Sequence, residues 1–102
     1  MTDVSAAELE DLLRREDRLV LVDFWSPRCE PCRELRPQLA ALAGEHADLC
    51  AVVAVDADRE PAAARRHGVA ELPTLVFFKG GRELYRLKGG ALPPSTLSLL
   101  SL

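Results

Sequence analysis

The amino-acid sequence predicts an α/β fold in which helices cover both faces of a mixed β-sheet. Two apolar runs, residues 19–25 and 49–55, are separated by a segment of helical periodicity. A helix between two strands of one sheet requires a parallel crossover connection. Two later runs, residues 75–78 and 83–87, flank a glycine-containing turn and predict an antiparallel hairpin. Parallel and antiparallel pairs together make the sheet mixed.

Size and composition are those of an ordinary globular protein. The chain has 102 residues, of which 48% are hydrophobic and 28% charged, so we expect a single domain over residues 1–102. The net charge of -3, with acids and bases interspersed, argues against a nucleic-acid partner or an anionic membrane surface. No run approaches the roughly 20 apolar residues of a bilayer-spanning helix.

The first helix is expected to begin at Ser5 and to end near Arg15. Ser5 and Glu8 have the spacing of a capping box, in which the hydroxyl and the carboxylate each accept a hydrogen bond from an otherwise free N–H group. Leucines then recur at helical spacing, at positions 9, 12 and 13. The helix should therefore bury one leucine-rich face.

The strand predicted over residues 19–25 contains one acidic residue, Asp23. All other positions of the run are apolar on both alternating faces, as is typical of a central strand covered on each side. A carboxylate inside such a strand costs free energy unless it has a partner or a function. Asp23 is therefore a candidate site residue.

The remaining elements follow from periodicity and from prolines and glycines. Apolar residues recur every three to four positions over residues 31–45, which predicts a long helix kinked at Pro37. After the strand over 49–55, a short helix is expected over residues 61–67, closed by the glycine that follows. A short capping helix is expected over residues 97–102.

Cys29 and Cys32 lie one helical turn apart, where the predicted strand gives way to the long helix. Two thiols in this arrangement can close a disulfide and open it again. In a chain with three cysteines, such a pair favours a catalytic or metal-binding role over a structural one. Because the start of a helix stabilises an anion, we expect Cys29 to ionise more readily than a free cysteine.

Two alternatives compete with redox chemistry at this pair. The cysteines could be inert apolar side chains, or they could belong to a zinc site, since Cys29, Cys32, His46 and Cys50 have nearly the spacing of a zinc finger. The long helix argues against zinc, because it would hold Cys32 and His46 about 21 Å apart. Zinc ligands converge within about 2.3 Å of one ion. Cys50 is expected to be a packed apolar side chain.

The chain resembles the thioredoxin family from about Val4 to Leu100, nearly its whole length. Three segments carry the resemblance in the expected order: residues 22–33 resemble the active-site segment, residues 55–58 the loop after the next strand, and residues 72–75 the cis-proline loop. A Cys-x-x-Cys motif by itself is weaker evidence than these segments together. The resemblance implies the thioredoxin fold.

The resemblance also implies a protein-disulfide reductase. Cys29 attacks a client disulfide and forms a mixed disulfide, which Cys32 then resolves. The family assigns removal of the Cys32 proton to the aspartate that matches Asp23. Burial raises the pKa of a carboxyl group because desolvation penalises the charge, which suits proton exchange near neutral pH.

Four further residues are implied in substrate binding. Leu72 would offer backbone hydrogen bonds to the client peptide, and Pro73 would have a cis peptide bond, which only about 5% of X-Pro bonds in folded proteins adopt. Trp25 is expected to be core or active-site wall. Arg28, at a position where the family most often has tryptophan, completes the set.

Charge at the site departs from the family pattern at three positions. Arg28 favours the Cys29 thiolate, whereas Glu30, which replaces a common glycine, opposes it, and the net effect stays open. Val52 stands where many members place a buried lysine near the aspartate. The absence of this lysine predicts a still higher pKa for Asp23, or a water molecule that takes the place of the missing cation.

The resemblance implies no metal and no bound cofactor beyond the redox-active disulfide. Electrons are expected from NADPH through a flavoprotein, a thioredoxin reductase, and the other partners are client proteins with disulfides. We expect a cytoplasmic location, because the N-terminus shows no secretory leader. We also expect a monomer. The competing interpretation is a thioredoxin-fold binding or scaffold module in which the cysteines are vestigial.

Overall fold

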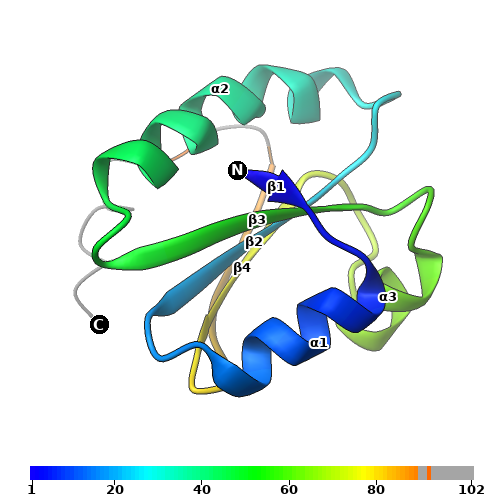
Figure 1. Cartoon of the computed structure of the whole chain (residues 1–102). Coiled ribbons are helices and arrows are strands. Elements are labelled where there is room, and N and C mark those ends of the chain that lie inside the picture. Colours follow the sequence, from blue (N-terminus) through cyan, green and yellow to red (C-terminus); the bar gives the residue numbers. More distant parts are fainter. Residues whose placement is uncertain (90–91, 93–102) are drawn as a thin grey trace.

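The computed structural model describes residues 1–89 and Leu92 and contains one five-stranded sheet (Figure 1). The elements are β1 (Thr2–Asp3), α1 (Ala6–Arg15), β2 (Leu19–Trp25), α2 (Glu30–Glu45), β3 (Cys50–Asp56), α3 (Pro61–Arg66), β4 (Thr74–Lys79) and β5 (Arg82–Lys88). The strand order is β1-β3-β2-β4-β5. Strands β1 and β2 pair with β3 in parallel, whereas β4 pairs antiparallel with both β2 and β5, so the mixed sheet is confirmed.

Helices cover both faces of the sheet, with α2 on one face and α1 and α3 on the other (Figure 1). Side chains of a strand alternate between faces, and β2 contributes to two separate core clusters for this reason. One cluster packs Leu19 and Leu21 with the α2 leucines, and the other packs Val20, Val22 and Phe24 with Leu9, Leu13 and Ala63. The predicted two-sided burial of β2 is confirmed.

Local sequence signals set most element boundaries. The Ser5 hydroxyl accepts a hydrogen bond from the Glu8 backbone at 3.1 Å, and the Glu8 carboxylate accepts one from the Ser5 backbone at 2.9 Å, so the predicted capping box is present. Strand β2 has the predicted bounds. Strand β3 lies one residue later than predicted, and α2, which contains Pro37, begins one residue earlier because Cys29 is its N-cap.

Two further features differ from expectation. Strand β1 was not predicted, because two residues are too few to show an alternating pattern. The hairpin strands are longer than predicted, and only Gly80 and Gly81 join them. Both glycines have positive φ, 58° and 79°, the conformation of the tight hairpin turns that match strand twist. The short helix expected over residues 97–102 lies outside the described residues.

Replacing Ser5 by alanine is expected to lower the free energy of unfolding by about 1 kcal/mol, because α1 then loses its N-cap acceptor. Urea denaturation of the variant and the parent protein measures this change. Ser5→Asn is the matched control, since asparagine also caps helices. A loss of equal size in both variants would show that the cap is not responsible.

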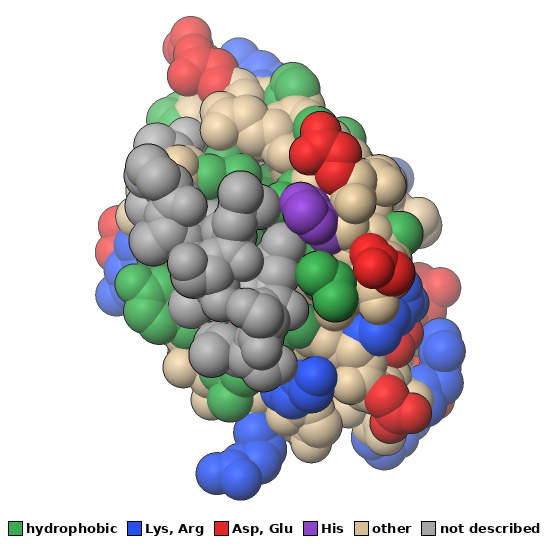
Figure 2. Space-filling model, turned by 90° about the vertical axis from the view of Figure 1, so that its left-hand side faces the viewer, with side chains coloured by type: hydrophobic (Ala, Val, Ile, Leu, Met, Phe, Trp, Pro, Cys, Tyr) green, Lys and Arg blue, Asp and Glu red, His purple; other side chains and the backbone are tan. Residues whose placement is uncertain are grey.

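The surface carries charges of both signs. Figure 2 shows acidic and basic side chains interleaved on one face of the molecule, with no continuous area of a single sign among the side chains it describes. None of the helices in the described part of the chain has the length and apolarity that crossing a bilayer requires.

Candidate active site

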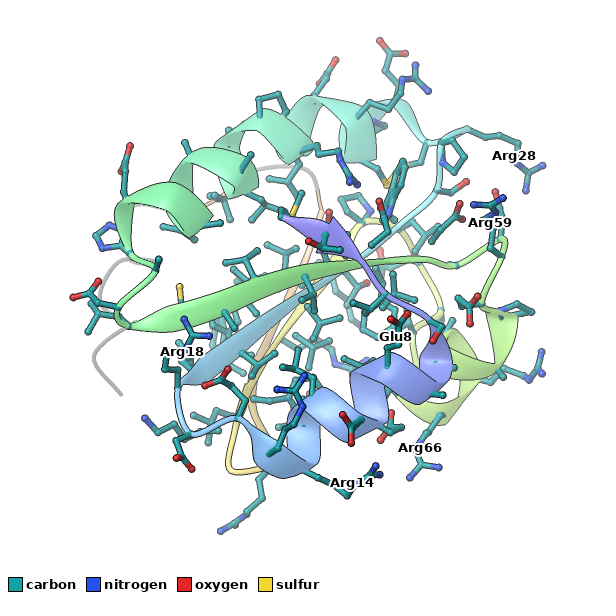
Figure 3. All side chains as sticks on the ribbon, viewed as in Figure 1. Glu8, Arg14, Arg18, Arg28, Arg59 and Arg66 are labelled. Atoms are coloured by element: carbon teal, nitrogen blue, oxygen red, sulfur yellow. A yellow bond between two sulfur atoms is a disulfide. The ribbon has the colours of Figure 1, made fainter. Side chains whose placement is uncertain are left out.

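The two nearby cysteines lie at the edge of the sheet where β2 and β3 end. Parallel strands finish at the same edge, so the segments that follow β2 and β3 meet there. Figure 3 shows Arg28 and Arg59, one from each of these segments, at the same end of the molecule, with Arg18 at the opposite end. The topology thus brings residues 26–33 together with residues 57–60.

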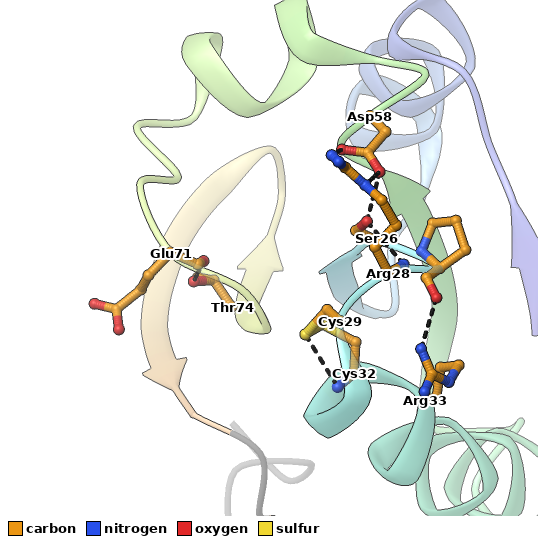
Figure 4. Close-up of a disulfide and its surroundings, with 9 residues drawn as sticks. Ser26, Arg28, Cys29, Cys32, Arg33, Asp58, Glu71 and Thr74 are labelled. Atoms are coloured by element: carbon orange, nitrogen blue, oxygen red, sulfur yellow. Dashed lines mark hydrogen bonds and ion pairs between the residues drawn. A yellow bond between two sulfur atoms is a disulfide. The ribbon is translucent and has the colours of Figure 1, made fainter.

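Cys29 and Cys32 form a disulfide, with Cα atoms 5.2 Å apart. Cys29 is the N-cap of α2, and its sulfur accepts a hydrogen bond from the Cys32 backbone N–H at 3.3 Å (Figure 4). In the reduced protein this N–H group and the helix dipole favour a negative charge on the same sulfur. Cys29 is partly exposed, whereas Cys32 has no exposed surface, so the two sulfurs are not equivalent.

Asp58 pairs with Arg28 at the edge of the site. Its oxygens accept hydrogen bonds from the Arg28 guanidinium at 3.0 and 3.2 Å and from the Ser26 hydroxyl at 2.5 Å (Figure 4). The hydrogen bonds from Arg28 and then from Ser26 hold the pKa of Asp58 below its usual value. Much of the positive charge of Arg28 is therefore matched by Asp58, and the arginine side chain stays 83% exposed.

Trp25, the last residue of β2, contacts two charged residues that the sequence analysis missed. Its Nε1–H group donates to Asp3 at 2.7 Å, and the Arg36 guanidinium carbon lies 4.4 Å from its ring centroid. Arg36 also binds the other Asp3 oxygen at 2.8 Å. These partners come from β1 and α2, which no local sequence pattern links to β2.

Asp23 is fully buried in β2 and faces α2, because it follows Leu19 and Leu21 at the alternating period. Neither of its oxygens has a hydrogen-bond partner among the described residues. Burial raises the pKa of Asp23 to about 7; attraction by Arg36 opposes this effect, and repulsion by Asp3 adds to it. The raised pKa expected from burial is therefore present, at a value that allows proton exchange near neutral pH.

The peptide bond between Leu72 and Pro73 is cis, as the resemblance implied. Thr74 pairs with Phe24 of β2, so the buried Pro73 lies beside the end of β2, where the cysteine loop begins. The Thr74 hydroxyl donates to the Glu71 carbonyl at 2.6 Å. In Figure 4 the Cys29 sulfur points towards this loop.

The alternative of a zinc site has no support in the geometry. His46 is the C-cap of α2, at the opposite end of the helix from Cys32. Cys50 is buried in the core cluster beneath α2, as predicted, and its thiol donates to the His46 carbonyl at 3.5 Å. Within residues 1–89 and Leu92, no group of three or more histidine, cysteine or acidic side chains is placed to hold a metal ion.

Comparisons with known proteins agree with this geometry. The Thioredoxin family model matches residues 1–98. The chain is 37% identical over 99 residues to "Thioredoxin 1" of Nostoc sp., with 92% of each chain covered. It is 42% identical over 73 residues to the thioredoxin of Alicyclobacillus acidocaldarius, covering 72% of this chain and 70% of that one.

A solved structure gives the same result. The X-ray structure of Fasciola hepatica thioredoxin superposes with a TM-score of 0.83 at 38% identity and covers 89% of this chain and 88% of that one. Thioredoxins need no bound cofactor; they act on disulfides of client proteins and are recharged by a reductase. The paired cysteines at the start of α2, the cis-proline loop beside them and these relatives lead to one conclusion: the chain belongs to the thioredoxin family and is a thiol-disulfide oxidoreductase.

Proposed function

We propose that this protein reduces disulfide bonds of client proteins in the cytoplasm as a monomeric, single-domain dithiol reductase. The observation that supports the proposal is that the two sulfurs differ in exposure and in hydrogen bonding. Cys29 is partly exposed and accepts a helix N–H group, as an attacking thiolate requires, whereas Cys32 is shielded within bonding reach. A client therefore meets Cys29 first.

The reaction transfers two electrons to the client. The Cys29 thiolate attacks one client sulfur, a mixed disulfide forms, and the other client sulfur leaves as a thiolate that takes up a proton. Asp23 then accepts the proton of the Cys32 thiol, and the Cys32 sulfur attacks the Cys29 sulfur. The bond between Cys29 and the client breaks, the Cys29–Cys32 disulfide forms, and the second client thiolate is released. The pKa of Asp23, about 7, supports this proton transfer.

Client binding is assigned to the surface around Cys29. We assign backbone hydrogen bonds with the client to Leu72, whose position is held by the cis peptide bond to Pro73. Trp25 forms one wall, and the exposed Arg28 lies at the rim. The position of this loop beside the end of β2 supports the assignment.

We assign the reduction of the Cys29–Cys32 disulfide after each turnover to a flavoprotein, a thioredoxin reductase that takes electrons from NADPH. A pair of cysteines in a catalytic role, together with the buried Cys50 outside any disulfide, suits a reducing compartment such as the cytoplasm. We assign no role in binding nucleic acid or membranes, in keeping with the net charge of -3.

A trapping experiment tests the attack by Cys29. The Cys32→Ser variant is expected to form a covalent adduct with insulin, because the mixed disulfide at Cys29 then has no resolving thiol. Intact-protein mass spectrometry detects the adduct, which dithiothreitol should release. The Cys29→Ser/Cys32→Ser double variant is the matched control and should form none. A redox-inactive scaffold module would give no adduct with either variant.

A further inference from the structure

Three buried side-chain polar atoms have no hydrogen-bond partner among the described residues. Two are the carboxylate oxygens of Asp23, and the third is Nη1 of Arg36. Leaving a buried charged group without a partner costs free energy, more than for a neutral group. The unpartnered atoms thus belong to two side chains of opposite charge. Each could provide what the other lacks, since the arginine nitrogen donates hydrogen bonds and the carboxylate oxygens accept them.

The register of the sheet places Asp23 in a row with Asp3 on the α2 face. Asp3 of β1 pairs with Ala54 of β3, and Ala54 pairs with Asp23 of β2. Two strand spacings, about 10 Å, therefore separate the backbones of the two aspartates. The intervening side chain, that of Ala54, is a single methyl group with no polar atom.

Arg36 reaches this row from α2 and is held there on two sides. Its Nη2 binds one Asp3 oxygen at 2.8 Å, and its Cζ lies over the Trp25 ring, whose N–H group binds the other Asp3 oxygen. The guanidinium group is rigid and planar, so these contacts also set the direction of Nη1. Although 31% of the side chain is exposed, Nη1 is shielded from solvent.

We propose that Arg36 is a positioning residue for Asp23, with Nη1–H directed at the carboxylate and stabilising its ionised form through an intervening water molecule. No direct hydrogen bond joins the two side chains, and a bridging water would satisfy the buried nitrogen and the buried oxygens together. The catalytic consequence, that Arg36 sets the pH at which Asp23 accepts the Cys32 proton, rests on the proposed function of Asp23.

The charges around Asp23 agree with this role. Burial is the main effect on its pKa and raises it, while Arg36 lowers it and Asp3 raises it. Its neighbours across the sheet, Ala54 on β3 and Leu75 on β4, are uncharged. Arg36 favours the ionised form of Asp23 in two ways: it attracts the Asp23 carboxylate, and it forms an ion pair with Asp3, the carboxylate that repels Asp23.

The test is an NMR titration of the Asp23 carboxyl carbon in isotope-labelled protein. The oxidised form is used, so that neither paired cysteine titrates. Removing the cation with Arg36→Met is expected to move the midpoint to higher pH by about one pH unit, because an opposite charge near a carboxylate changes its pKa by about that much or more. Arg36→Lys, which keeps the positive charge, should return the Asp23 midpoint most of the way to its wild-type pH.

Two further variants control for the loss of any arginine from α2 and for a failure to fold. Arg33→Met removes an exposed arginine of the same helix, whose guanidinium binds the Pro27 carbonyl at 2.7 Å, and should leave the midpoint unchanged. Arg36→Gln supplies a second uncharged side chain should Arg36→Met fail to fold. An Asp23 midpoint that stays at the wild-type pH in the folded uncharged variant overturns the positioning role.

Insulin reduction by Asp23→Asn separates this inference from the proposed function. We expect Asp23→Asn to reduce insulin more slowly than the wild type. In Arg36→Met, the acidic limb of the pH profile for insulin reduction should shift in the same direction as the Asp23 midpoint. Wild-type rates in Asp23→Asn, combined with a shifted midpoint in Arg36→Met, would remove Asp23 from the proton transfer and leave Arg36 as its positioning residue.

Discussion

Cys29→Ser is expected to abolish insulin reduction and to leave only the background rate of dithiothreitol alone. A serine hydroxyl stays protonated near neutral pH and forms no bond of the disulfide type, so neither the attack nor the mixed disulfide can occur. Precipitation of reduced insulin measures the rate, with dithiothreitol or with NADPH and thioredoxin reductase as electron source.

Cys50→Ala is the matched control for the loss of a thiol. Cys50 is buried beneath α2, and burial raises the pKa of its thiol, which makes it a poor nucleophile. The Cys50→Ala variant should therefore keep the wild-type rate. Equal rates for Cys29→Ser and wild type would refute the reductase mechanism, whereas a loss in both cysteine variants would point to a structural cause.

Asp23→Asn is expected to stabilise the oxidised protein by about 4 kcal/mol at about pH 8 and by less than about 1 kcal/mol at about pH 4. Asparagine resembles the protonated carboxyl group in shape and is always neutral. The variant therefore avoids the cost of placing an ionised, buried carboxylate in β2. That cost is present only where the wild-type residue is ionised.

The direction follows from the pKa of Asp23, which is raised from 3.8 in the unfolded chain to about 7 in the folded protein. Between these values the folded protein binds the proton more tightly than the unfolded chain does, so stability falls as the pH rises. Below about pH 4 both states hold the proton, and the difference between wild type and variant disappears.

Urea denaturation of both proteins across this pH range measures the effect. Use of the oxidised form removes the titration of Cys29 and Cys32, and the two histidines contribute equally to wild type and variant. Asp48→Asn, the same substitution at an exposed position after α2, is the control for the chemical change and should leave the free energy of unfolding close to that of the wild type. A stability difference that does not vary with pH would rule out a raised pKa at Asp23.

Local patterns predicted much of the fold. The capping box at Ser5, the two-sided apolar run of β2 and the glycines of the hairpin turn each involve residues a few positions apart, so they can be recognised without the partner elements. The spacing of Cys29 and Cys32 belongs to the same class, because one helical turn separates them and allows them to form a disulfide. Strand β1 escaped prediction because two residues form no pattern.

The charged environment of the site depends on contacts between distant residues. Arg28 contacts Asp58, 30 residues away, and Arg36 contacts Asp3, 33 residues away. Both pairs exist because parallel strands end at one edge and because the register of β1 and β3 aligns Asp3 with the row of Asp23. A short segment of sequence shows neither which strand will lie on each side of it nor in which register the two strands will pair.

Sequence alone was therefore sufficient for the spacing of Cys29 and Cys32, the helix that begins at them and the buried position of Asp23, because periodicity and spacing are properties of neighbouring residues. The redox role of the two cysteines followed from the resemblance of three separate segments to the thioredoxin family. Tertiary structure decided which charges surround that aspartate and that the Arg28 charge is matched by Asp58. The physical reason is that electrostatic interactions depend on distance in space, and folding brings together side chains that the chain keeps apart.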